Sequence, residues 1–233
     1  MRRFVSVLLL FAVMLFTSCE SIQILDYPAR KQAQDKKAAQ GISEAAPKSL
    51  PKDTKGLSQK QKQLVEAAYW AKGKTSLSVN GKKYKMDCSG VVSAIYQKAG
   101  IDLTKDFKKY KGGGVQRIHE TLRSKGLTYR PTVPVPGDIL FWDNTYDANK
   151  NGRADDTLSH IGMVVSSDKR TGEVVYIHHH EKKGIVFEKM NLLHPNDPAY
   201  NAGMRDSKAK KLPGNKYLAS QLYKDAGKGY LMK

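Results

Sequence analysis

The fold is decided by the segment at residues 87–100, which reads DCSGVVSAIYQKAG. An apolar run follows its polar start, and its final glycine is the residue type that commonly ends helices, so we predict a helix over residues 88–99. Cys88 would begin this helix, where the positive end of the helix dipole favours a thiolate. A free cysteine is also commonly a small buried hydrophobe, so a catalytic role requires a base and an orienting group elsewhere.

Helices precede strands along the rest of the chain. Upstream, Ser58 is expected to cap a helix over residues 59–71, and Asn80-Gly81 is typical of a hairpin turn within residues 75–85. The elements expected downstream are a helix at 115–124, strands at 139–142, 161–165, 174–178 and 184–188, and a last packing helix at 217–223. Helices followed by a run of strands indicate an α+β domain.

Two histidines stand at the ends of expected strands. His160 immediately precedes the strand at 161–165, and His178 closes the strand at 174–178. A lone histidine is more often structural than catalytic. Two at neighbouring strand ends, downstream of a cysteine at a helix start, favour a catalytic site of the Cys–His type.

Several motifs, in this order, are similar to those of the NlpC-type cell-wall peptidases, which are papain-like cysteine hydrolases. The motifs are Asp87-Cys88-Ser89-Gly90, Pro136-Gly137-Asp138-Ile139-Leu140-Phe141, Ser159-His160-Ile161-Gly162-Met163-Val164, and Tyr176-Ile177-His178 with Gly184 six residues later. The resemblance covers roughly residues 60–190. It implies a papain-like domain with N-terminal helices packed on an antiparallel β-sheet.

The resemblance also implies the role of each residue. Cys88 would be the nucleophile, His160 the general base and then the acid for the leaving amine, and His178 the residue that orients His160. Within the tract His178-His179-His180, the six-residue spacing to Gly184 favours His178, and His180 is the alternative. A metal-binding role for this tract, together with Cys88, is a further alternative.

One position departs from the family pattern. Family members usually carry a tyrosine in a Gly-x-x-Tyr segment near the start of the domain, where it helps to shape the substrate cleft. Aligned on Gly73, that position holds Ser76. Tyr69 and Tyr84 are the tyrosines that could take its place in space.

An oxygen-rich loop spans residues 147–156 and reads D-x-N-x-N-G-x-x-D-D. Its 1, 3, 5 spacing with glycine at position 6 is the ligand pattern of EF-hand-type calcium loops. The candidate ligands of a structural Ca²⁺ are Asp147, Asn149, Asn151, the backbone carbonyl of Arg153, and Asp155. Position 12 is Leu158 rather than glutamate, and two cations lie in the loop, so binding is expected to be weak at most. An Asx-rich turn between strands is the alternative.

The N-terminus predicts export. Residues 1–18 have the charge and the apolar run of a signal peptide, and this run is shorter than the roughly 20 residues that span a bilayer. Residues 15–19 resemble a lipobox, so Cys19 is expected to carry lipid; an ordinary secretory signal is the alternative. Residues 19–57 are expected to be a flexible tether, and 58–233 the catalytic domain with a C-terminal extension. The expected location is the bacterial cell envelope, on the periplasmic side of a membrane.

The chain of 233 residues is strongly basic, with 40 Lys+Arg, 22 Asp+Glu and a net charge of +18. This charge suits a membrane surface or an acidic wall polymer such as peptidoglycan. Export, and the lack of a basic helix with interleaved aromatics, argue against nucleic acid. We expect a monomer that needs no cofactor for catalysis.

These features predict a lipid-anchored cysteine endopeptidase that hydrolyses peptide bonds in peptidoglycan stem peptides. One alternative is an N-acetylmuramoyl-L-alanine amidase on the related CHAP-like fold, which would use the same Cys–His chemistry. The other is a catalytically silent wall-binding lipoprotein, which the missing tyrosine favours and the intact cysteine and histidines oppose.

Overall fold

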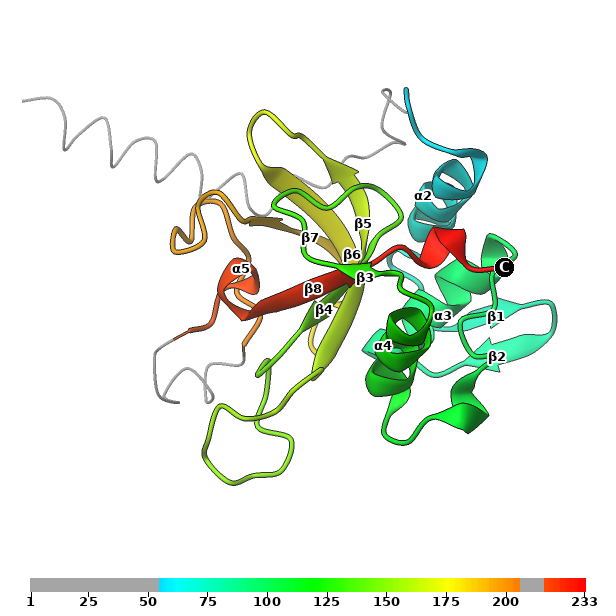
Figure 1. Ribbon diagram of the computed structural model, residues 1–233, viewed down its shortest axis with the longest axis horizontal. Coiled ribbons are helices and arrows are strands. Elements are labelled where there is room, and N and C mark those ends of the chain that lie inside the picture. The colour runs from blue at the N-terminus through cyan, green and yellow to red at the C-terminus, as the bar shows by residue number, and fades with distance from the viewer. Residues whose placement is uncertain (1–54, 206–215) are drawn as a thin grey trace, which may run out of the picture.

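Helices cover one face of an antiparallel sheet in the computed structural model, which describes residues 55–205 and 216–233 (Figure 1). This arrangement confirms the expected α+β class. The predicted signal peptide, the lipidation site Cys19 and nearly all of the predicted tether lie outside the described residues. Within the described residues, no helix is both long enough and apolar enough to cross a bilayer.

Three helices form where local sequence signals predict them. Helix α2 (Gln59–Ala71) begins after Ser58, whose side chain accepts from the backbone N–H of Gln61 in a capping box. Helix α3 (Cys88–Lys98) ends before Gly100, which has the left-handed φ of 78° that glycine adopts readily. Helix α4 (Gly114–Ser124) completes the set, and a short 3₁₀ helix, η2 (Phe107–Lys109), precedes it.

A small hairpin joins the first two helices. Strands β1 (Leu77–Val79) and β2 (Lys82–Tyr84) pair in antiparallel register around Asn80 and Gly81. Both turn residues have positive φ, 51° and 76°, as the predicted two-residue turn requires.

The main sheet has six strands, all antiparallel, in the order β3-β8-β4-β5-β6-β7. Their bounds are β3 (Thr128–Tyr129), β4 (Ile139–Trp142), β5 (His160–Ser167), β6 (Glu173–His180), β7 (Gly184–Asn191) and β8 (Tyr223–Gly227). The four predicted strands correspond to β4–β7. Strands β5 to β7 follow one another as a meander, which brings their ends together.

The last predicted helix, over residues 217–223, is shorter in the structure. The structure has only a four-residue helix α5 (Ala219–Leu222), after which the chain forms β8 between β3 and β4, then a 3₁₀ helix η4 (Gly229–Leu231). Pairing on both sides satisfies the backbone groups of β8 and overrides its poor strand composition.

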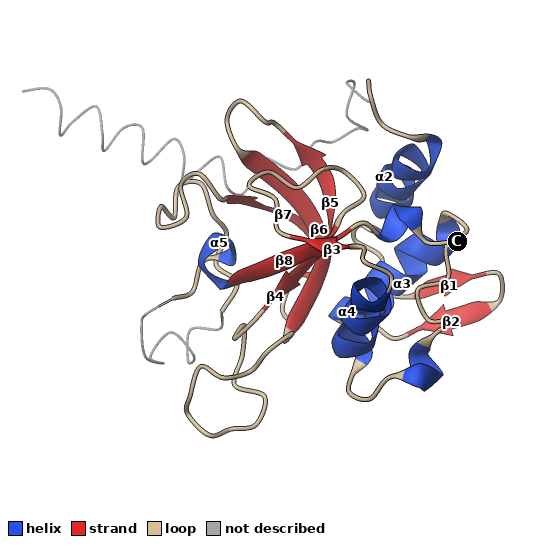
Figure 2. Cartoon of the chain, viewed as in Figure 1, coloured by secondary structure: helices blue, strands red, loops and turns tan. Residues whose placement is uncertain are grey.

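The two faces of the sheet carry separate cores. Helices α2, α3 and α4 lie on the opposite side of the sheet from α5 (Figure 2). One core lies between the sheet and helices α2, α3 and α4, and includes Ile161, Ile177 and Phe187. The other includes Trp142, Tyr176 and α5, and the Trp142 indole N–H donates to the carbonyl of Ala219 at 2.8 Å. The even-numbered residues of β6 and β7 therefore face the second core, which places His178 and Glu188 on one side of the sheet.

Candidate active site

Cys88 is the first residue of α3, and the preceding residue holds the helix start in place. One carboxylate oxygen of Asp87 accepts from the backbone N–H of Gly90 at 2.7 Å and from the Ser89 hydroxyl at 2.9 Å. Gly90 leaves no room for a side chain, because a Cβ atom there would lie 2.2 Å from the carbonyl oxygen of Lys85. The motif around the cysteine is thus a tightly built helix start.

The Cys88 sulfur lies against the strand that begins at His160. The backbone N–H of Ile161, the second residue of β5, donates to this sulfur, and α3 packs on β5 and β6. Burial, and then the Asp87 carboxylate, raise the pKa of Cys88 to about 11. The helix dipole alone predicts the opposite direction, and burial outweighs it. At neutral pH the proton therefore stays on the sulfur.

His160 and His178 are brought into direct contact, as predicted. Nε2 of His160 lies 2.9 Å from Nδ1 of His178, with the ring planes 82° apart. This contact uses Nε2 of His160 and leaves Nδ1 as the ring nitrogen open to a second partner. Burial, and then His178, hold the pKa of His160 well below its usual range, so its ring is neutral near neutral pH.

Glu188 on β7, which the sequence analysis missed, adds a carboxylate to the pair of His160 and His178. Its Oε2 lies 3.1 Å from Nε2 of His178, and its Oε1 accepts from the ammonium of Lys183 at 2.9 Å. Its pKa is lowered to about 2, because hydrogen bonds from His178 and Lys183, together with the Lys183 charge, outweigh burial. The carboxylate is therefore ionised at neutral pH.

The other two histidines of the tract take different positions. The His180 ring lies 5.9 Å from the His178 ring on the same face, as strand alternation predicts, and its Nδ1 accepts from the backbone of the β6–β7 turn. His179 is on the opposite face, near Asp87. His178, not His180, makes the contact with His160. In the described part of the chain, no group of three or more His, Cys, Asp or Glu side chains could hold a metal ion.

Among the described residues, no hydrogen bond or ring contact joins Cys88 to Ser76, Tyr69 or Tyr84. Ser76 is exposed, the Tyr69 ring packs edge-on against Phe187 at 5.0 Å, and Lys82 lies over the Tyr84 ring. A different tyrosine, Tyr146, is near Cys88: burial raises the pKa of Tyr146, and Cys88 raises it further.

Tyr146 lies in the loop between β4 and β5, next to Thr145, which a hydrogen bond holds in place. The hydroxyl of Thr145 lies 2.9 Å from that of Ser159, the residue before His160. Thr145 is buried, whereas Tyr146 is 51% exposed. An exposed aromatic ring therefore emerges beside the active site.

The candidate calcium loop forms a compact turn of its own. The Asp147 carboxylate accepts from the backbone of Asn151 and Gly152, and the amides of Asn149 and Asn151 both donate to Asp155. Four predicted side-chain ligands thus converge, and Arg153 offers its carbonyl. Ca²⁺ takes about six to eight oxygen ligands, so this donor set fits if water completes the shell.

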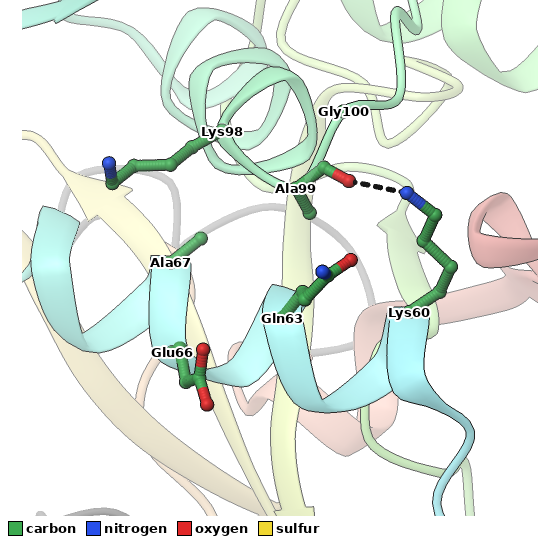
Figure 3. A pocket seen from close by; sticks show the side chains of 7 residues that line it. All are labelled: Lys60, Gln63, Glu66, Ala67, Lys98, Ala99 and Gly100. Carbon is green, nitrogen blue, oxygen red and sulfur yellow. Dashed lines mark hydrogen bonds between the residues drawn. The ribbon is translucent and has the colours of Figure 1, made fainter.

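A pocket between α2 and α3 lies away from this chemistry (Figure 3). It is lined by the C-terminal end of α3, including Lys98, and by Lys60 and Glu66 of α2. The Lys60 ammonium is already bonded to the carbonyl of Ala99 at 2.9 Å. Because Cys88 starts α3 and this pocket is at the other end of the helix, the pocket is not part of the active site.

The family assignment agrees with this geometry. The model of the NlpC/P60 family matches residues 67–202, which is more than half of the chain and includes Cys88, His160, His178 and Glu188. The chain belongs to the NlpC/P60 family, whose members are generally cysteine peptidases and amidases that act on the cell wall. A comparison with curated proteins found no match.

Proposed function

We propose that this protein is a cysteine endopeptidase that hydrolyses peptide bonds in the stem peptides of bacterial peptidoglycan. The observation that carries the proposal is the site itself: a thiol at a helix start, packed on the strand that begins with His160, and a second histidine bonded to that ring. Family membership supports the cell-wall substrate. The strongly basic sequence suits an acidic polymer.

The proposed mechanism begins with proton transfer from the Cys88 thiol to Nδ1 of His160. The sulfur attacks the peptide carbonyl carbon, and the tetrahedral oxyanion takes a hydrogen bond from the backbone N–H of Cys88 at the helix start. When the C–N bond breaks, protonated His160 gives its proton to the leaving amine. Water, deprotonated by the same ring, then hydrolyses the thioester and restores the thiol.

The products of peptidoglycan digestion test this proposal and separate it from its alternatives. The full chain is incubated with purified peptidoglycan, and the soluble fragments are analysed by mass spectrometry. Cut stem peptides still joined to glycan support an endopeptidase. Intact stems released from glycan move the assignment to an amidase, and no products from a folded protein favour a wall-binding role.

We also propose that Cys19 carries lipid and holds the catalytic domain at a membrane of the cell envelope. The lipobox-like residues 15–19 support this proposal. Metabolic labelling with a fatty acid analogue tests it. Label on the parent and none on Cys19→Ala is the expected result, and equal label on both would exclude lipidation at this residue.

A third proposal is that the loop at residues 147–156 binds Ca²⁺ weakly. The convergence of Asp147, Asn149, Asn151 and Asp155 on one another supports it. The ion would replace these internal hydrogen bonds with ligand bonds and stiffen the loop that leads to His160. It has no part in the proposed chemical steps.

A further inference from the structure

We propose that Glu188 is a positioning residue of the active site, which determines through His178 which ring nitrogen of His160 acts as the base. The inference rests on the proposed peptidase function, since it concerns the same Cys–His chemistry. It goes beyond that function by assigning a role to a residue outside the three that the sequence motifs identify.

The position of Glu188 is fixed by the sheet. It lies on β7 directly opposite Tyr176 of β6, so it shares the second-core face with His178 on the neighbouring strand. The side chains of both residues are buried, with 9% and 3% of their surface exposed. Each carboxylate oxygen has its own partner: Oε2 meets Nε2 of His178 at 3.1 Å, and Oε1 meets the Lys183 ammonium at 2.9 Å.

These contacts determine where the protons are. An ionised carboxylate only accepts hydrogen bonds, so Nε2 of His178 must carry the hydrogen that points to Glu188. When the His178 ring is neutral it has one N–H, which makes its Nδ1 an acceptor. Nε2 of His160 must then be the donor in the 2.9 Å contact, and Nδ1 of His160 is left with its lone pair for the thiol proton.

No other described group around His178 can fix its tautomer in the same way. The Tyr176 ring lies 5.3 Å from the His178 ring, but its buried hydroxyl interacts with the Glu188 carboxylate and not with a ring nitrogen of His178. The His180 ring packs edge-on against His178 at 5.9 Å, and its Nδ1 is bonded to the backbone of the turn. The protonation pattern therefore depends on Glu188.

The substitution Glu188→Gln tests this role because Lys183 fixes which end of the new side-chain amide faces His178. The ammonium of Lys183 can only donate, so it binds the single amide oxygen and turns the amide N–H₂ toward His178. Nε2 of His178 then has to accept, the hydrogens move to Nδ1 in both rings, and the base nitrogen of His160 is blocked. In serine-protease triads, an analogous Asp-to-Asn change lowers kcat about 10⁴-fold through the wrong tautomer.

We expect Glu188→Gln to lower kcat about a hundredfold or more, with KM little changed. Adding Lys183→Met frees the amide to turn its oxygen toward His178, so the double variant should recover about tenfold of this loss. Unchanged kcat in Glu188→Gln, or a double variant no better than the single one, would overturn the proposal. A purely structural role of Glu188 predicts no such rescue.

Glu173→Gln is the matched control. Glu173 is a half-exposed glutamate that faces Lys189, 3.8 Å away across the same two strands. It makes no contact with the histidines, so kcat should stay within about twofold of the parent.

A second readout does not depend on activity. The ¹⁵N shifts of the ring nitrogens, measured on the full chain in detergent, should show hydrogen on Nε2 of His160 and His178 in the parent and on Nδ1 in Glu188→Gln. Hydrogen on Nδ1 of His160 in the parent refutes the inference. The expected shifts in a chain that cuts no peptidoglycan would refute the proposed function and leave the assignment of Glu188 intact.

Discussion

The buried carboxyl of Asp138 makes the stability of the protein depend on pH. It is completely buried at the turn before β4; its Oδ2 accepts from the Tyr129 hydroxyl and the backbone N–H of Val135, and its Oδ1 has no partner among the described residues. Burial raises the pKa of Asp138 to about 6, from the ordinary value of 3.8. The folded protein therefore keeps a proton that the unfolded chain releases between pH 4 and 6.

This difference sets the sign and size of the effect. Because the folded state binds more protons in this window, the free energy of unfolding falls as pH rises through it. A pKa raised from 3.8 to about 6 corresponds to a loss of about 3 kcal/mol by pH 7. Asp138→Asn resembles the protonated acid, since the amide oxygen can accept from both donors, and it should not show this loss.

Urea unfolding of the parent and of Asp138→Asn, followed by tryptophan fluorescence from pH 4 to 7, measures the difference. Across this range we expect it to change by about 2 kcal/mol in favour of the variant as pH rises, since part of the full effect already falls below pH 4. Tyr129→Phe is a useful companion, because the Tyr129 hydroxyl lowers the pKa of Asp138; its loss should extend the window to higher pH. A difference that stays constant, or that moves in favour of the parent as pH rises, refutes the reasoning.

Three further predictions concern the surroundings of the active site. Gly90→Ala should destabilise the fold by about 2–3 kcal/mol in thermal unfolding, because its Cβ would meet the backbone of Lys85; an unchanged melting temperature would contradict this. Millimolar Ca²⁺ should raise the melting temperature of the parent by a few degrees, and Asp147→Ala should lose this gain, whereas equal gains would exclude the loop as the site. Tyr146→Ala should raise KM about fivefold and leave kcat within twofold, because the exposed ring stands beside Cys88; an unchanged KM argues against contact with substrate.

The sequence predicted the elements whose signals are local. The Asn80-Gly81 turn, the Ser58 cap and the helix that starts at Cys88 each depend on neighbouring residues, and all three are present. Strand β8 was missed because its conformation depends on pairing with two strands that are distant in the sequence. Strand β3 lies about a hundred residues before β8, and β4 lies about eighty residues before it. Its own residues, with a lysine, an aspartate and a glycine, carry little strand signal.

The role of Glu188 could have been predicted from the sequence, whereas the pKa of Cys88 could not. The turn before Gly184 fixes the β6–β7 register, and strand alternation then places residue 188 on the face of His178. A reading of that register could have identified Glu188. The pKa of Cys88 could not be predicted in this way, because the helix dipole is visible in the sequence, whereas the burial that outweighs it depends on how α3 packs on the sheet.

Removal of the thiol tests whether Cys88 carries out the proposed nucleophilic attack on a wall peptide. The full chain and its Cys88→Ala variant are incubated with purified peptidoglycan, and released peptides are quantified while circular dichroism verifies that both are folded. We predict cut stem peptides from the parent and none above background from the variant. Equal release by a folded Cys88→Ala protein would contradict the account.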